Sequence, residues 1–120
     1  MTSPHVGPDD EHGAASVLAL SVVAVVLVLT MGGLVVGSVV VASHRARVAA
    51  DLGSLAAASA IQDGASPVQA CALAQQVVHA NGAATQSCSS RGADVELRVV
   101  VRAPLWPEPA AARSRAGPER

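Results

Sequence analysis

Residues 13–43 read GAASVLALSVVAVVLVLTMGGLVVGSVVVAS, and this stretch of 31 residues contains no charged side chain. A continuous apolar run of about 18 or more residues is typical of a transmembrane helix, because a water-soluble fold cannot cover so much apolar surface on one helix. The sequence therefore predicts a membrane-anchored protein whose transmembrane helix covers residues 13–43.

The length of this run sets it apart from other apolar segments. As a helix it would be roughly 46 Å long, whereas the hydrocarbon core of a bilayer is about 30 Å thick, so we expect it to tilt or to project beyond the bilayer. A cleavable signal peptide is the alternative, with Val41-Ala42-Ser43 as the cleavage site, but its apolar core would be shorter and its first flank basic. An amphipathic surface helix is excluded because the run is apolar on every face.

The flanking residues divide the chain into further segments. Residues 1–12 are polar, acidic and interrupted by proline, so we expect a disordered leader. Residues 44–103 are expected to form a small extracytoplasmic domain. Residues 104–120 are proline-rich and are expected to form a mostly disordered tail, in which Ala110–Ala116 would suit a third edge strand.

The first part of the domain continues the helix. Val48, Leu52 and Leu55 recur at helical spacing, and no helix breaker separates them from the apolar run. We expect one helix from about Ala15 to Gln62.

A second helix is predicted after Gly64, which is expected to end the first. Ser66 suits its N-cap, Pro67 its first turn, and Gln69 completes a capping box. Asn81-Gly82 would end it. The residues expected on its inner side are Val68, Cys71, Ala72 and Val78.

A strand is predicted further on, where apolar and polar residues alternate over 95–101. Residues 83–88 are expected to pair with it across 89–92 as a hairpin, which must pack on the second helix because an isolated hairpin is only marginally stable. The expected fold class is therefore membrane-anchored α+β: a long N-terminal transmembrane helix that continues into a small domain with a second helix and a β-hairpin.

The two cysteines, Cys71 and Cys88, fall in this domain. The chain has one Trp and neither Phe nor Tyr, so the domain lacks the large rings that usually anchor a core. An even cysteine count in such a domain outside the cytoplasm favours a disulfide over two separate thiols, and the bond would stabilise the fold by ~3 kcal/mol in the chain-entropy model.

Helix packing inside the membrane has its own candidates. Gly33 and Gly37 form a G-x-x-x-G pair, whose flat strip lets a second helix approach closely, although glycine is common in membrane helices generally. Val48, Leu52 and Leu55 would extend the contact beyond the membrane.

Signals for other function classes are missing from the sequence. The net charge is −1 and the arginines are interleaved with acidic residues, which argues against nucleic-acid binding. The four histidines show no metal-ligand spacing, and neither a nucleophile elbow nor a phosphate loop occurs. We expect no enzymatic activity, no cofactor or metal, and no small-molecule substrate.

The residues after the anchor suggest a family. Residues 44–58, HRARVAADLGSLAAA, resemble the segment after the membrane helix of TadE/TadG-like pilus-assembly proteins, which tends to read Gln-x-Ala-Ala-Asp-Leu-Ala-Ala-Leu-Ala-Ala-Ala. Gly53 and Ser54 stand where that pattern has Ala-Ala. The glycine-rich start, Asn81-Gly82-Ala83 and residues 115–118 are similar to a short TadE-like subgroup encoded near secretion and helicase genes in GC-rich Gram-positive bacteria.

This resemblance implies a pilin-like or pseudopilin-like subunit of a tight-adherence (Flp-type) pilus or secretion apparatus. Its partners would be the membrane and other membrane subunits of that system, or copies of itself. A prepilin peptidase would cut between Gly13 and Ala14, although Leu18 stands where such substrates usually carry Glu. The alternative function is a small secreted or membrane-anchored binding module without an assembly role.

The orientation of the chain in the membrane depends on which of two opposing sequence signals dominates. Arg45 and Arg47 follow the apolar run and acidic residues precede it, so the positive-inside rule would place the C-terminal side in the cytoplasm. The resemblance and the cysteine pair place that side outside, and Asp51 partly offsets the two arginines. We expect a single-pass cell-membrane protein with a cytoplasmic N-terminus and an extracytoplasmic C-terminal domain.

Overall fold

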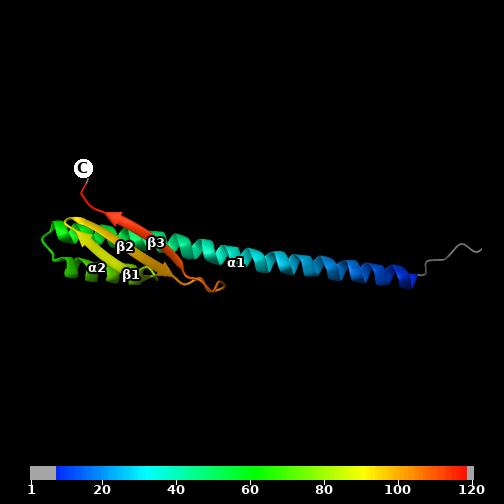
Figure 1. Cartoon of the computed structure of the whole chain (residues 1–120). Helices are drawn as coiled ribbons and strands as arrows, with labels where there is room; N and C mark the ends of the chain where they lie inside the picture. The colour runs from blue at the N-terminus through cyan, green and yellow to red at the C-terminus, as the bar shows by residue number, and fades with distance from the viewer. Residues whose placement is uncertain (1–7, 119–120) are drawn as a thin grey trace, which may run out of the picture. The chain divides into compact units, whose positions relative to one another are not determined.

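The computed structural model of the chain describes residues 8–118 and has an α+β fold. Most of the leader expected over residues 1–12 lies outside the described residues, as do residues 119–120 of the tail. The elements, in chain order, are α1 (Pro8–Gln62), α2 (Pro67–Ala80), β1 (Ala84–Arg91), β2 (Asp94–Val101) and β3 (Ala110–Ala116) (Figure 1).

Helix α1 contains the apolar run. It begins at Pro8, inside the segment expected to be disordered, and ends at Gln62 as expected. Among the described residues, it is the one helix long and apolar enough to cross a membrane, with a mean hydropathy of 2.7 in its most apolar window. The chain divides into two compact units between Leu34 and Val35.

The end of α1 is encoded locally. Gly64 has a φ of +96°, a conformation that residues with a Cβ rarely adopt. Its N–H donates to the Ile61 carbonyl at 3.0 Å, and the Ala65 N–H donates to the Ala60 carbonyl at 2.9 Å. These two bonds form a Schellman motif, which satisfies carbonyls that the helix end leaves open.

Helix α2 starts as the sequence predicts. The Gln69 N–H donates to Ser66 Oγ at 3.2 Å, and the Ser66 N–H donates to Gln69 Oε1 at 3.1 Å. Pro67 occupies the first turn. This capping box satisfies two backbone donors that would otherwise lack partners.

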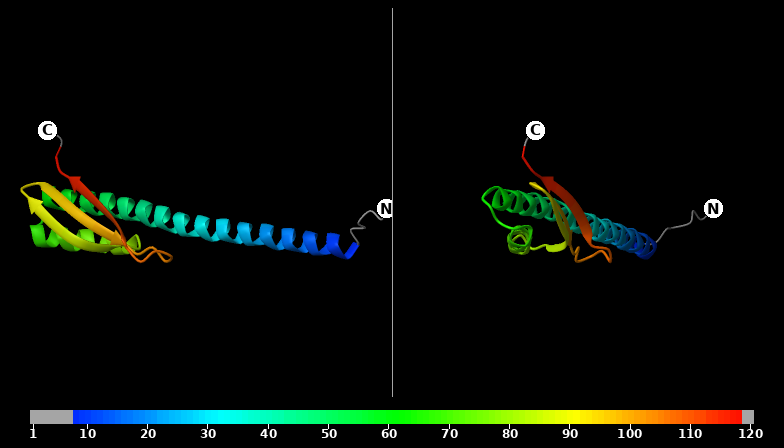
Figure 2. Two further views of the ribbon diagram at one scale, coloured as in Figure 1. Left: turned by 45° about the vertical axis from the view of Figure 1, so that its right-hand side comes forward. Right: turned by 60° about the vertical axis from the view of Figure 1, so that its left-hand side comes forward.

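The second unit has two layers. Its sheet is antiparallel with the order β1-β2-β3, and the helices cover one face of it, as Figure 2 shows. Val95, Leu97, Val99 and Val101 of β2 face the helices and are buried, which confirms the predicted half-buried strand. The helices contribute mainly alanine: Ala42, Ala46, Ala49, Ala50, Ala57 and Ala58 from α1, and Ala70 and Ala74 from α2.

Gly53 lies where α1 meets both α2 and β2. A Cβ placed there would lie 2.6 Å from Leu97 Cδ2 and 2.8 Å from Val78 Cγ2. Since real Cβ atoms do not approach so closely, glycine is what allows the three elements to pack at this distance. The neighbouring Ser54 is also buried, at 1% exposure. Both departures from the TadE-like pattern therefore lie in the helix–sheet contact.

The predicted inner side of α2 is wrong at two positions, Val68 and Ala72, which are both exposed. Val68 is 80% exposed, and the buried residues of α2 are Ala70, Ala74 and Val78. Ala70, Ala74 and Val78 share one direction at about 100° per residue, and Val68 and Ala72 point away from it, so they lie on the exposed side of α2.

The disorder expected over most of the tail 104–120 is wrong for Ala110–Ala116, where the alternative of a third edge strand is confirmed. Residues Ala110–Ala116 form β3, which pairs along its whole length with β2, from Val95 opposite Ala116 to Val101 opposite Ala110. The hairpin is therefore part of a three-stranded sheet. The open edge of β2 supplies hydrogen-bond partners that the composition of the tail does not reveal. In addition, β1 continues to Arg91, so the connection to β2 is shorter than the expected 89–92.

Candidate functional site

The two cysteines are joined by a disulfide. Cys71 of α2 and Cys88 of β1 are 17 residues apart in sequence, and their Cα atoms are 6.0 Å apart. This confirms the expected disulfide and its role of tying the second helix to the sheet. Cys88 packs against the buried core, so the bond supports the interior of the domain.

Gly33 and Gly37, the packing residues predicted within the apolar run, are not in contact with another element of the described chain. A Cβ built at Gly33 or at Gly37 meets nothing within 4 Å among the described residues. The structure thus brings neither glycine against another element of the chain. Gly13 and Ala14, the predicted cleavage positions, are exposed on α1, as is Leu18.

The packing residues predicted beyond the run are exposed as well. Val48, Leu52 and Leu55 have exposed fractions of 37%, 45% and 60%. Successive residues of an α-helix differ by about 100° in direction, which places these three opposite Gly53 and the buried alanines. Val41, also exposed, shares their direction. We call Val41, Val48, Leu52 and Leu55 the apolar stripe of α1.

The spacing within the apolar stripe is that of a helix seam. Val41, Val48 and Leu55 recur every seven residues. Apolar residues repeated at this interval form the contact line between two α-helices that pack lengthwise. Val48, Leu52 and Leu55 were predicted from their helical spacing, whereas Val41 was not, although it precedes Val48 by the same seven-residue interval.

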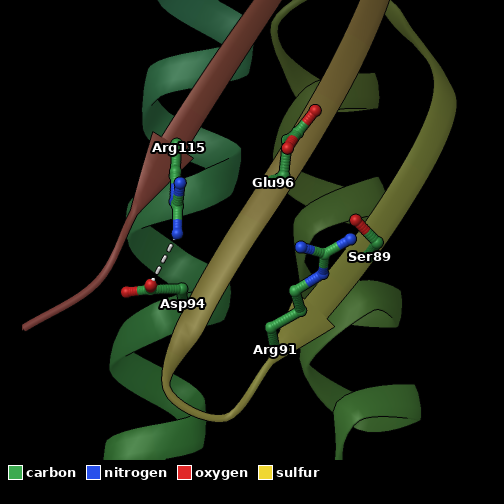
Figure 3. A pocket seen from close by; sticks show the side chains of 5 residues that line it. All are labelled: Ser89, Arg91, Asp94, Glu96 and Arg115. Atoms are coloured by element: carbon green, nitrogen blue, oxygen red, sulfur yellow. Dashed lines mark hydrogen bonds and ion pairs between the residues drawn. The ribbon is translucent and has the colours of Figure 1, made fainter.

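The other exposed surface of the domain is the outer face of the sheet. A hollow of about 90 Å³ lies there (Figure 3). Its lining residues are Ser89, Arg91, Asp94, Glu96 and Arg115. Arg115 Nη2 donates to Asp94 Oδ2 at 2.8 Å, and Arg113 Nε lies 3.2 Å from Glu96 Oε1. Exposed ion pairs of this kind contribute about 0–1 kcal/mol each, so this is a solvated sheet face.

A metal site is not formed within residues 12–118, where no group of three or more His, Cys, Asp or Glu side chains could hold an ion. Sequence reasoning also missed an exposed pair in the β2–β3 loop, Leu105 and Trp106. The signal available was that Trp106 is the one aromatic residue of the chain.

Comparison of the chain with protein-family models, with curated proteins and with solved structures finds no match. Of the exposed surfaces described above, the apolar stripe of α1 is the best-supported candidate functional surface.

Proposed function

We propose that the chain is a non-enzymatic, pilin-like membrane subunit that assembles by lateral packing of helix α1, as a TadE-like component of a tight-adherence pilus or secretion apparatus. The single observation that carries this proposal is the apolar stripe, which stays exposed on a helix whose opposite face is fully used by the domain. The assignment to a tight-adherence pilus or secretion apparatus rests on the resemblance of residues 44–58 to TadE/TadG-like proteins.

The two faces of α1 within the second unit differ in kind. The face toward the sheet consists mainly of glycine, serine and alanine, which allow close packing with α2 and β2. The stripe instead presents larger branched side chains to the surroundings. Contiguous exposed apolar surface of this sort marks an interaction site, since covering it with another apolar surface is favourable. A second α1 helix supplies a matching surface.

The location of the domain is part of the proposal. The uncharged run 13–43 would span the cell membrane, with the N-terminus cytoplasmic and the domain outside. The Cys71–Cys88 disulfide supports this orientation, because disulfides persist in oxidising compartments outside the cytoplasm.

Cysteine crosslinking in membranes tests the stripe directly. Val48→Cys places a thiol on it, and Arg47→Cys places one on the adjacent exposed position that points in another direction. Both native cysteines are already bonded, so the new thiol is the reactive one. Oxidation should link Val48→Cys into dimers, and Arg47→Cys much less. Equal crosslinking of the two variants would contradict lateral packing through the stripe.

N-terminal sequencing of the mature protein separates the proposal from its alternative. A start at Ala14 supports processing by a prepilin-type peptidase. A start at His44 would mean that the run is removed, which supports a secreted binding module. An intact N-terminus would leave the anchor and exclude the peptidase step.

A further inference from the structure

The loop between β2 and β3, residues 102–109, carries two large apolar side chains on its surface. Leu105 is 53% exposed and Trp106 is 49% exposed. Pro104 and Pro107 flank the pair, and the Trp106 N–H donates to the Ala103 carbonyl at 3.3 Å, which closes a tight turn. About half of each of these two apolar side chains is therefore open to the surroundings of the loop.

The position of this loop along α1 follows from the packing at Gly53. Leu97 of β2 faces Gly53, and Ala103 follows Leu97 by six residues. Six extended residues cover about 20 Å, which corresponds to about 13 residues of α-helix. Since β2 runs opposite to α1, the loop lies near residue 40 of α1, and the tilt of the strand shortens this distance somewhat. Figures 1 and 2 show the loop beside this part of the helix.

Burial along α1 agrees with this position. Val35, Ser38 and Val39 are half-buried and Ala42 is buried, although all four belong to the uncharged run. Val39 packs against the core cluster that contains Ala42 and Ala103. The loop therefore stands at the level of residues 35–43, the last part of the apolar segment.

The length of the run places this level in the bilayer. A helix over residues 13–43 is roughly 46 Å long, and a bilayer with its headgroups is about 40–45 Å thick, so residues near 40 lie in the headgroup zone. We propose that loop 102–109 rests in the headgroup zone of the same bilayer and is anchored there by Leu105 and Trp106. This inference rests on the proposed membrane span. Trp is enriched at this depth because its ring is apolar and its N–H is polar.

The charges of the loop agree with a shallow depth. Arg102 and Glu108 are both exposed at its ends. Charged side chains are costly in the hydrocarbon core but are tolerated among headgroups, where they stay hydrated. The loop therefore fits the lipid–water interface and not the membrane interior. The contact is the same on either side of the membrane, so it does not depend on the orientation of the chain.

Intrinsic fluorescence tests this contact without a label, because Trp106 is the only tryptophan and the chain has no tyrosine. The full chain is reconstituted in phosphatidylcholine–phosphatidylglycerol vesicles whose acyl chains carry bromine either near the headgroup or near the methyl end. We expect loss of most Trp106 emission with the shallow bromines, little loss with the deep ones, and protection from aqueous iodide. Leu105→Asp keeps the fluorophore and should reverse this pattern.

A second variant separates failure of the loop contact from failure of the membrane span. Leu27→Trp combined with Trp106→Phe moves the fluorophore into the apolar run and should be quenched by the deep bromines. If this variant is quenched but Trp106 is open to iodide and insensitive to shallow bromines, the loop contact is overturned and the span stands. If the Leu27→Trp variant is not quenched, both the span and the loop contact are overturned.

Discussion

Buried Ser54 of α1 and half-buried Ser114 of β3 share a hydrogen bond, with 3.0 Å between their Oγ atoms across 60 residues of sequence. The Ser54 hydroxyl also donates to the Asp51 carbonyl at 3.0 Å. Because one hydroxyl has one proton, Ser114 is the donor to Ser54. The bond links the edge strand β3 to the helix that carries the apolar stripe.

Replacing these two serines should have unequal effects. Ser54→Ala leaves the half-buried Ser114 hydroxyl without its acceptor; an unsatisfied buried donor costs about 1–3 kcal/mol, and partial hydration of Ser114 puts the expected loss at about 1 kcal/mol. Ser114→Ala leaves Ser54 still bonded to Asp51 and should cost less. Urea unfolding of the full chain in detergent micelles would measure both, and the double variant should be more stable than the sum of the single changes implies. Additive effects would argue against the shared bond.

Gly53→Ala should destabilise the domain. Its Cβ would press on Leu97 and Val78, and overpacking of a core costs about 1–3 kcal/mol. The higher helix propensity of alanine offsets up to about 1 kcal/mol of that cost.

Gly37→Ala is the matched control, because its Cβ meets no atom within 4 Å among the described residues. The same unfolding measurement should show no loss of stability for this variant. If Gly53→Ala were as stable as Gly37→Ala, the close contact at Gly53 would not exist.

Loss of the Cys71–Cys88 disulfide should lower the free energy of unfolding by about 3 kcal/mol, because the open loop restores entropy to the unfolded chain. The bond ties α2 to β1, and the core around it is made largely of alanine. The measurement compares the urea midpoint of the wild-type chain with and without reducing agent. A Cys71→Ser/Cys88→Ser variant should match the reduced chain and respond no further to the reductant.

Gly33→Ile combined with Gly37→Ile should weaken association in a membrane two-hybrid assay. The added side chains would hold a second helix away from the flat strip, since packing between membrane helices depends on close backbone approach. Leu27→Ile is the control, because it leaves both glycines in place and changes only the shape of an exposed apolar side chain. Unchanged association in the double variant would exclude the glycine pair as a contact.

Fusion of alkaline phosphatase to the C-terminus should give an active enzyme, because we expect the domain to lie outside the cytoplasm, where that enzyme matures. A fusion to the N-terminus should stay inactive. An inactive C-terminal fusion at normal expression would mean that Arg45 and Arg47 control the orientation as the positive-inside rule states.

Several elements were predictable because their signals are local. The capping box needs only Ser66 and Gln69, which lie within one turn. The alternation of apolar and polar residues over 95–101 indicates a strand with one buried face, without showing which element covers that face. Gly64 ends α1 because its backbone adopts a positive φ. The disulfide was predicted from cysteine count and compartment.

By itself, the sequence determined that this chain has an apolar helix long enough to cross a membrane, a capped second helix and a half-buried strand. Only the tertiary structure decided which apolar residues form the core. The contact of α1 with α2 and β2 at Gly53 buries Val78 and Leu97, while Val68, Leu52 and Leu55 lie on other faces of their helices and remain exposed. It also decided that Ala110–Ala116 is a strand, because its partners, the edge of β2 and Ser54, are distant in sequence.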